Sequence, residues 1–307
     1  MIANQFALIR RELWEHRSIY ITPAVVALVI TMMLLTGYIF ATGYKELVNI
    51  GIVGAQNLAA DAHRRMALAA FLIVGNTVPF ILASAVLIIF YSLDSLYAER
   101  KDKSILFWRS LPLTDTETVV SKLLTAVVVI PLISFGVIAI SHLVSLALTS
   151  LFVSFENGSP GILIWKSAPL FDVWATVLII SLILPIWFSP FIGWFLLVSA
   201  WTKRSPLLTA FLPLVLLPMV EYFIPPHTHY LGEAIKSRFT GLPLFSGIDP
   251  HVFFDEKALA ARTSVVKLVE YIDLGKFLSS PATWAGVLVC GIFVTAAIYV
   301  RRYRDES

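Results

Sequence analysis

The pair Gly275-Lys276 is the nearest approach in this chain to a phosphate-binding loop. Such a loop has the pattern G-x-x-x-x-G-K-[ST], in which backbone N–H groups cradle the phosphates and the final hydroxyl holds Mg²⁺. Here Phe277 stands where the hydroxyl is needed, and Glu270 stands where the first glycine should be. We therefore expect no ATP site and no bound cofactor in this chain.

Histidines are the next candidates for chemistry, because His227, His229 and His251 fall in one polar stretch. Their imidazoles could meet at a metal ion. Solvent-exposed loop histidines are the simpler interpretation, so we predict no metal site. The metallopeptidase spacing H-E-x-x-H and the nucleophile elbow G-x-S-x-G are both absent. We accordingly predict no catalytic residue.

His142 stands apart because it is the lone ionisable side chain deep inside a long apolar run. A hydrogen bond to a neighbouring helix is its simplest role, and contact with a substrate is the alternative. Trp187, Trp194 and Trp201 recur every seven residues, a spacing that keeps them close to one helix face. That stripe either packs against lipid and other helices or lines a pathway through the membrane.

The elements that must position these residues are membrane helices. Hydrophobic residues make up 58% of the 307 and charged residues 14%, whereas a soluble domain carries about 25% charged residues. The net charge of +3 is small, and nothing favours nucleic-acid binding. The sequence predicts an all-α polytopic membrane protein, a single domain over 1–307, with six segments near or above the roughly 20 residues that cross a bilayer. They lie at about 19–42, 67–93, 120–151, 173–201, 206–224 and 282–300.

The fifth segment is the weakest, because Pro206, Pro213 and Pro218 interrupt it and Glu221 lies near its end. Proline removes a helical hydrogen bond, so a kinked or partly re-entrant segment is an alternative to a full crossing. If this segment fails to cross, the C-terminus changes side.

Lysine and arginine are unevenly distributed among the connecting segments. With the N-terminus inside, the inner segments carry 13 of these residues on roughly 60 positions, and the outer segments carry 10 on roughly 100. A cytoplasmic excess is the rule, so we expect both termini to be cytoplasmic. The outer loop, 225–281, is small for an independent core, and we expect a cap on the spans with a helix at about 255–271.

Residues 1–18 place Ile2, Phe6, Ile9 and Leu13 on one narrow helix face, with the charged side chains off it. This pattern predicts either an amphipathic interfacial helix in the headgroup layer or an ordinary helix that precedes a span.

A charged strip, residues 94–118, lies together with Lys122 between two long runs that contain no charge, 66–93 and 123–155. In this strip a charged block is followed by an apolar block. That pattern predicts a short helix that lies along the membrane and binds another protein. Thr114 and Glu117 fit a capping box, in which the hydroxyl and the carboxylate each satisfy a free backbone N–H. We therefore expect an ordered loop, with a new helix that begins directly after Thr114.

The chain resembles the permease subunits of ABC-2 type transporters, which are bacterial exporters related in architecture to the ABCG group. Members commonly show a Glu-Arg pair after the second span, a Leu-Pro-x-[ST] turn and a lysine at the start of the third. Here these are Glu99-Arg100, Leu111-Pro112-Leu113-Thr114 and Lys122. Lys101-Asp102-Lys103-Ser104 departs from the smaller, glycine-containing stretch of the family. The almost charge-free spans fit an energy source on another polypeptide.

The resemblance implies a subunit of the bacterial cytoplasmic (inner) membrane that pairs with a second permease, identical or related. Two copies of a separate ABC ATPase would bind ATP and Mg²⁺ and drive alternating access. The strip 94–118 would act as a coupling helix on that ATPase, with apolar residues buried at the contact and charged residues steering it. The contact residues would be Leu96, Tyr97, Glu99, Arg100, Lys101, Lys103, Ile105, Phe107 and Trp108.

Two other functions remain open. An ATP-independent membrane scaffold or assembly factor would bind its partner through the outer loop, 225–281. An intramembrane enzyme would need converging polar groups inside the bundle, and the sequence offers few besides His142.

Overall fold

A computed structural model of the chain describes residues 2–44, 46, 49, 67–103, 113–223, 229–244 and 268–303. Over these ranges the chain forms helices and no strand. Six of the described helical stretches are long and apolar enough to cross a membrane, which confirms the prediction of an all-α, multi-pass architecture. They are Ser18–Ala41, Ala67–Lys101, Asp115–Phe155, Leu170–Trp187, Pro206–Phe223 and Pro281–Tyr303.

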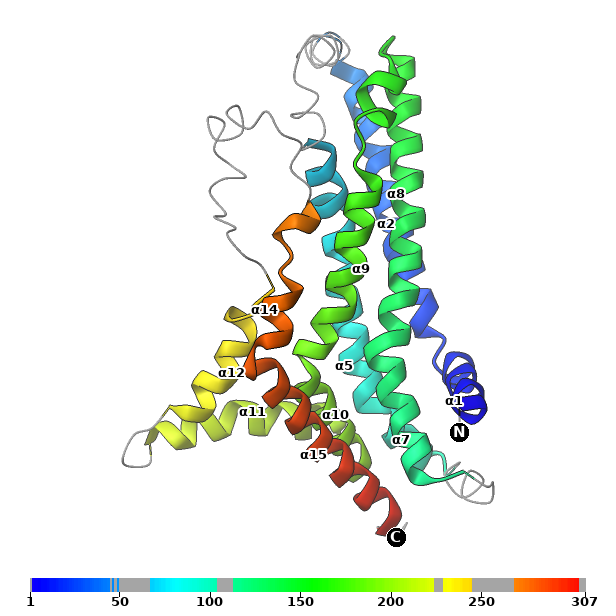
Figure 1. The fold of residues 1–307 in the computed structure, drawn as a ribbon. Coiled ribbons are helices and arrows are strands. Elements are labelled where there is room, and N and C mark those ends of the chain that lie inside the picture. The colour runs from blue at the N-terminus through cyan, green and yellow to red at the C-terminus, as the bar shows by residue number, and fades with distance from the viewer. Residues whose placement is uncertain are drawn as a thin grey trace.

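Four long helices run along the length of the molecule and form its bundle (Figure 1). The first of them, α2, is apolar on all sides and buries Ile19, Pro23 and Ile30, as suits a helix surrounded by lipid. These four are α2 (Ser18–Ala41), α5 (Val78–Lys101), α8 (Ile130–Phe155) and α9 (Leu170–Trp187).

The second span is longer than the sequence predicts. Helix α5 continues to Lys101, so the first part of the charged strip is the end of this helix and not a separate helix along the membrane. The prediction is wrong there because Leu96 and Glu99 pack inside the bundle, at 1% and 4% exposure. Asp102 caps the end of the helix, and the backbone of the next residue, Lys103, is left-handed with a φ of 57°.

The predicted capping box is confirmed. Helix α7 (Asp115–Leu124) begins directly after Thr114. The Thr114 hydroxyl accepts a hydrogen bond from the Glu117 N–H at 3.1 Å, and the Glu117 carboxylate accepts one from the Thr114 N–H at 3.0 Å. Through the π-helical segment η3 (Thr125–Val129), α7 leads into α8.

The fourth predicted segment is two helices. Helix α9 ends at Trp187, and α10 (Ser189–Trp201) begins after Phe188. Pro190 explains the break, because a proline cannot donate a helical hydrogen bond and disfavours helical backbone at the residue before it. Helix α10 then packs closely on α15 (Pro281–Tyr303), since a Cβ added at Gly193 would lie 3.0 Å from the Cα of Cys290.

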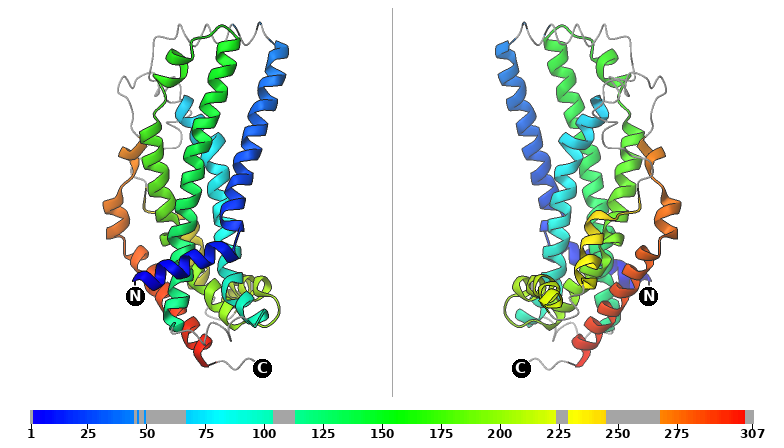
Figure 2. Two further views of the ribbon diagram at one scale, coloured as in Figure 1. Left: turned by 90° about the vertical axis from the view of Figure 1, so that its right-hand side faces the viewer. Right: turned by 90° about the vertical axis from the view of Figure 1, so that its left-hand side faces the viewer.

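Helix α11 (Pro206–Phe223) lies crosswise to the long helices. It is seen from the side in Figure 1 and along its axis in both views of Figure 2. Its length and composition would let it cross a membrane, although it does not run parallel to α2, α5, α8 and α9 (Figures 1 and 2). Pro213 and Pro218 lie inside the helix.

The predicted outer loop, 225–281, is described in part. Helix α12 (Tyr230–Thr240) follows α11, and α14 (Leu274–Ser279) leads into α15. Most of the predicted helix at 255–271 lies outside the described residues. Its last four residues form the short helix η6 (Leu268–Tyr271), whose first two N–H groups, at Leu268 and Val269, donate to the Asp172 carboxylate of α9.

The N-terminal helix α1 (Ile2–Glu15) forms as predicted. Leu8 and Glu12 are buried, whereas Phe6 is 70% exposed. Helix α1 and the end of α15 lie at the same end of the molecule (Figures 1 and 2).

Candidate functional site

Lys122 lies at the centre of a charged cluster at the end of the bundle that carries α1. Its side chain is closed to solvent, at 0% exposure. The Nζ atom lies 2.8 Å from Glu12 Oε1 of α1 and 3.1 Å from Glu99 Oε1 of α5. A buried ammonium is tolerated only when it is paired. This side chain of α7 therefore holds α1 and α5 together.

Glu99 brings a fourth helix into the cluster. Its Oε1 accepts a hydrogen bond from Arg11 Nη2 at 2.9 Å, and its Oε2 accepts one from Arg301 Nη1 at 2.6 Å. Arg301, on α15, also donates to Asp115 Oδ1 at 3.0 Å. Charge-assisted hydrogen bonds of this kind are roughly twice as strong as neutral ones. One carboxylate thus connects the end of α5 to α1, α7 and α15.

Glu12 has a second set of partners on its other carboxylate oxygen. The Tyr91 hydroxyl donates to Glu12 Oε2 at 2.7 Å, and His16 Nε2 lies 3.7 Å from the same oxygen. The His16 ring meets the Tyr91 ring edge-on, with 5.0 Å between the ring centres. Burial lowers the pKa of His16 more than the Glu12 carboxylate raises it. The imidazole is therefore neutral at physiological pH.

We call this cluster the ion-pair network. Oxygens of Glu12, Glu15 and Glu99 lie within 4.8 Å of one another, a spacing that could hold a metal ion. The ammonium of Lys122 and the guanidinium of Arg11 already bring positive charge to these oxygens, so the geometry does not indicate a metal site. The network consists of Arg11, Glu12, Glu15, Glu99, Asp115, Lys122 and Arg301.

The residues predicted to contact a partner ATPase fall into buried, exposed and undescribed positions. Leu96 and Glu99 face the interior and are occupied by other helices of this chain, so neither is exposed for a partner. Lys101 and Lys103 are exposed at the end of α5. Three further residues, Ile105, Phe107 and Trp108, lie outside the described part of the chain.

Tyr97 and Arg100 fasten α5 to the end of α10 and to the connection that leads from it to α11. The Arg100 guanidinium donates to the carbonyl oxygens of Ser199 and Thr202. The Tyr97 hydroxyl donates to the carbonyl oxygen of Arg204 at 2.8 Å. The polar groups of Tyr97 and Arg100 are therefore already bound within this chain, beneath the surface predicted to contact the ATPase.

The predicted tryptophan stripe is not continuous, because the helix breaks at Phe188. Trp187 is buried, and its Nε1 donates to the carbonyl oxygen of Arg238, whose guanidinium lies 4.5 Å from the centre of the indole. The Nε1 of Trp194 donates to the carbonyl oxygen of Ala210 in α11 at 3.0 Å. Trp201 is 50% exposed. The three side chains thus have three different environments, and only Trp194 and Trp201 remain on one continuous helix.

His142 forms a hydrogen bond to a neighbouring helix, which is the simpler of the two roles expected for it. Its Nε2 lies 3.1 Å from Thr77 Oγ1, in the π-helical segment η2 (Phe71–Thr77). The Thr77 hydroxyl donates to the carbonyl oxygen of Leu72, so it accepts from His142, and Nε2 carries the proton. Beside it, Asn76 accepts from Ser141 and donates to Ser145, both at 2.8 Å.

Comparison with family models, with curated proteins and with solved structures finds no match to this chain. The geometry of the described residues is consequently the main guide to its function. The ion-pair network offers mutually paired acids and bases and no exposed nucleophile, so its chemistry is that of a mechanical connection between helices.

Proposed function

We propose that this chain is the membrane subunit of an ATP-driven exporter of the ABC-2 type, with its ATP and Mg²⁺ bound on a separate ATPase. The ion-pair network is the observation that supports the proposal most. It joins α1, α5, α7 and α15 at the end of the bundle from which residues 104–112 connect α5 to α7. A membrane subunit that is driven by a separate ATPase needs such a connection between its helices beneath the surface that the ATPase contacts.

The network lies directly beside both ends of that connecting segment. Glu99 is two residues before the end of α5, and Asp115 is the first residue of α7. A displacement of residues 104–112 would therefore reach α1 and α15 through charged contacts. Packed helices with alternative contacts switch between discrete arrangements. Such a switch would open the spans alternately to the two sides of the membrane.

The surface for the ATPase would be narrower than the sequence indicated. Lys101 and Lys103 are exposed there and would steer an acidic patch of the partner. Leu96, Glu99 and Arg100 would act beneath the surface by holding α5 in place. Because α1 and the end of α15 lie at this same end, both termini would be cytoplasmic, in a bacterial inner membrane.

A second permease, identical or related, would complete the transporter. Helices α2 and α11 support this, because both are apolar and largely exposed in the single chain. One or both would be covered by lipid and by the second permease.

Affinity purification in a mild detergent tests the proposal. Tagged protein from native membranes should retain a P-loop ATPase, identified by mass spectrometry. The double substitution Lys101→Glu, Lys103→Glu should reduce the retained ATPase at least about tenfold, because it reverses the steering charge. Lys166→Glu is the matched control, since Lys166 is an exposed lysine beyond the far end of α8.

Two results would contradict the proposal. One is wild-type protein that retains no ATPase although it is folded and monodisperse. The other is an equal loss of ATPase from the double variant and from the Lys166→Glu control, which would show that no specific surface at the end of α5 is involved.

A further inference from the structure

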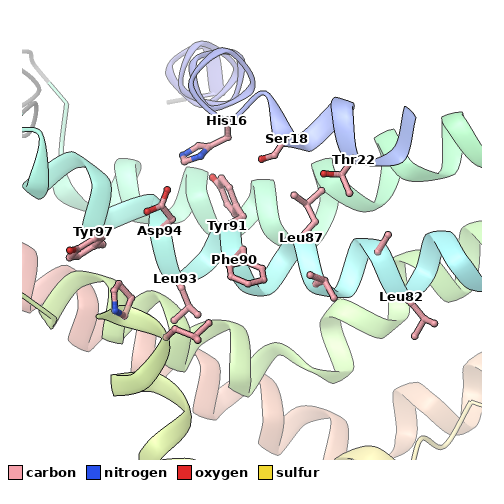
Figure 3. Close-up of a pocket in the computed structure, with 14 residues that line it drawn as sticks. His16, Ser18, Thr22, Leu82, Leu87, Phe90, Tyr91, Leu93, Asp94 and Tyr97 are labelled. Carbon is pink, nitrogen blue, oxygen red and sulfur yellow. The ribbon is translucent and has the colours of Figure 1, made fainter. Parts of the chain in front are cut away.

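A groove of about 700 Å³ lies between the start of α2, one face of α5 and the start of α11 (Figure 3). Its volume falls in the range of roughly 300–1,000 Å³ that is usual for small-molecule sites. His16 and Asp94 lie at one end of it, and Leu82 lies toward the other. The groove therefore has a polar end and an apolar length.

The apolar length is built by side chains at four-residue intervals along α5. Leu82, Val86 and Phe90 line it and are 63%, 53% and 57% exposed, and Leu207 of α11 lines it as well. From Leu82 to Asp94 the helix rises about 18 Å. One leaflet of the hydrocarbon core is roughly 15 Å deep. A single hydrocarbon tail would fit along this face.

The polar end is acidic. Asp94 is exposed, and its carboxylate has no hydrogen bond or ion pair within the described ranges. The cations Arg11 and Lys122 are paired with Glu12, Glu15 and Glu99 in the ion-pair network. Exposed Arg17 stands between His16 and Ser18 in the chain but does not itself line the groove. The Asp94 carboxylate thus remains available to a ligand. It would attract a protonated amine and repel a phosphate or a sulfate.

We propose that this groove binds a single-tailed amphiphile with a protonated amine as its head. The tail lies against Leu82, Val86 and Phe90, and the amine donates to the Asp94 carboxylate near His16. The shape of the groove selects the tail, and the charge at its end selects the head. This inference concerns equilibrium binding to the single chain, so it holds or fails independently of ATP-driven transport.

Photo-crosslinking in phosphatidylcholine nanodiscs tests the site. The probe is a long-chain alkyl amine with a diazirine in its chain, compared with the sulfate of the same chain. The amine should label peptides of α5 between Leu82 and Asp94 more strongly than the sulfate does. Asp94→Asn should weaken that labelling about tenfold, as expected for one charge-assisted hydrogen bond. Asp102→Asn, an exposed acid after the same helix, should leave it unchanged.

A second variant blocks the apolar length and keeps the test independent of Asp94. Val86→Trp should reduce labelling by the amine, whereas Leu28→Trp, on the exposed part of α2, should not. All variants are compared at equal monodispersity. Equal labelling by amine and sulfate, or labelling spread over all helices, would each overturn the proposal.

Discussion

The ammonium of Lys122 lies 2.8 Å from the carboxylate of Glu12, although 110 positions separate the two residues. Both side chains are closed to solvent, at 0% and 1% exposure. Desolvation of two such charges is costly, and their attraction offsets the cost only while both are present. The pair therefore fixes α1 against α7, and the loss of one partner should be far worse than the loss of both.

Lys122→Met tests this dependence. The substitution leaves Glu12 as a buried carboxylate without its ammonium partner, and we expect a loss of about 3–5 kcal/mol in the free energy of unfolding. The double variant Lys122→Met, Glu12→Gln should recover part of that loss. Denaturant unfolding in detergent measures all three proteins. Lys101→Met, at an exposed position, should change the free energy by about 0.5 kcal/mol or less, and an equal loss in both lysine variants would refute the pairing.

His16 should make stability dependent on pH. Burial lowers the pKa of its imidazole in the folded protein, with Lys122 acting in the same direction and Glu12 and Asp94 against it. The unfolded chain, with a pKa of about 6.5, then binds the proton more readily than the folded protein does. Stability is full above about pH 6.5 and falls as the pH drops through the window between the two pKa values.

We therefore expect the thermal midpoint of the wild-type protein to fall between about pH 7 and about pH 5.5. His16→Gln should fall less over the same window, because its side chain does not titrate. The midpoints are measured in one detergent and at constant ionic strength. Parallel curves for the two proteins would show that other groups cause the pH dependence.

Local signals in the sequence were sufficient to predict the positions of most of the helices. The apolar segments are long enough to be recognised from composition, and the start of α7 follows from Thr114 and Glu117, which lie three positions apart. The end of the second span was misplaced at 93, because a charged block is normally a sign of water. In this chain Glu99 is charged and buried, since three cations from other helices surround it.

The ion-pair network could not be predicted from the sequence. Glu99 lies 88 positions from Arg11 and 202 positions from Arg301, and no spacing rule connects them. Its formation depends on which helices are neighbours. The same tertiary contacts orient α1, because the pairing of Glu12 with Lys122 directs the face of Glu12 inward and leaves Phe6 exposed.

Gly193 permits the close contact between α10 and α15. A Cβ at this position would lie 3.0 Å from both the Cα and the carbonyl oxygen of Cys290, which are backbone atoms and cannot rotate away. We expect Gly193→Ala to cost about 1–3 kcal/mol through overpacking. Gly291→Ala is the control on α15, because no atom lies within 4 Å of its added Cβ. That control should be neutral or stabilising by up to about 1 kcal/mol, and a similar loss in both variants would refute the contact.

The sides of the membrane can be assigned with single cysteines, because Cys290 is the sole cysteine of the chain and is 5% exposed in the contact with α10. The parent protein should react little with a membrane-impermeant maleimide. We expect Lys166→Cys to be labelled in intact cells, and Lys101→Cys only after the membrane is permeabilised, because the proposed ATPase side is cytoplasmic. Both positions are exposed, so reactivity reports the side and not burial. Labelling of Lys101→Cys from outside would place the end of α5 out of reach of any cytoplasmic ATPase and would remove the basis of the transport proposal.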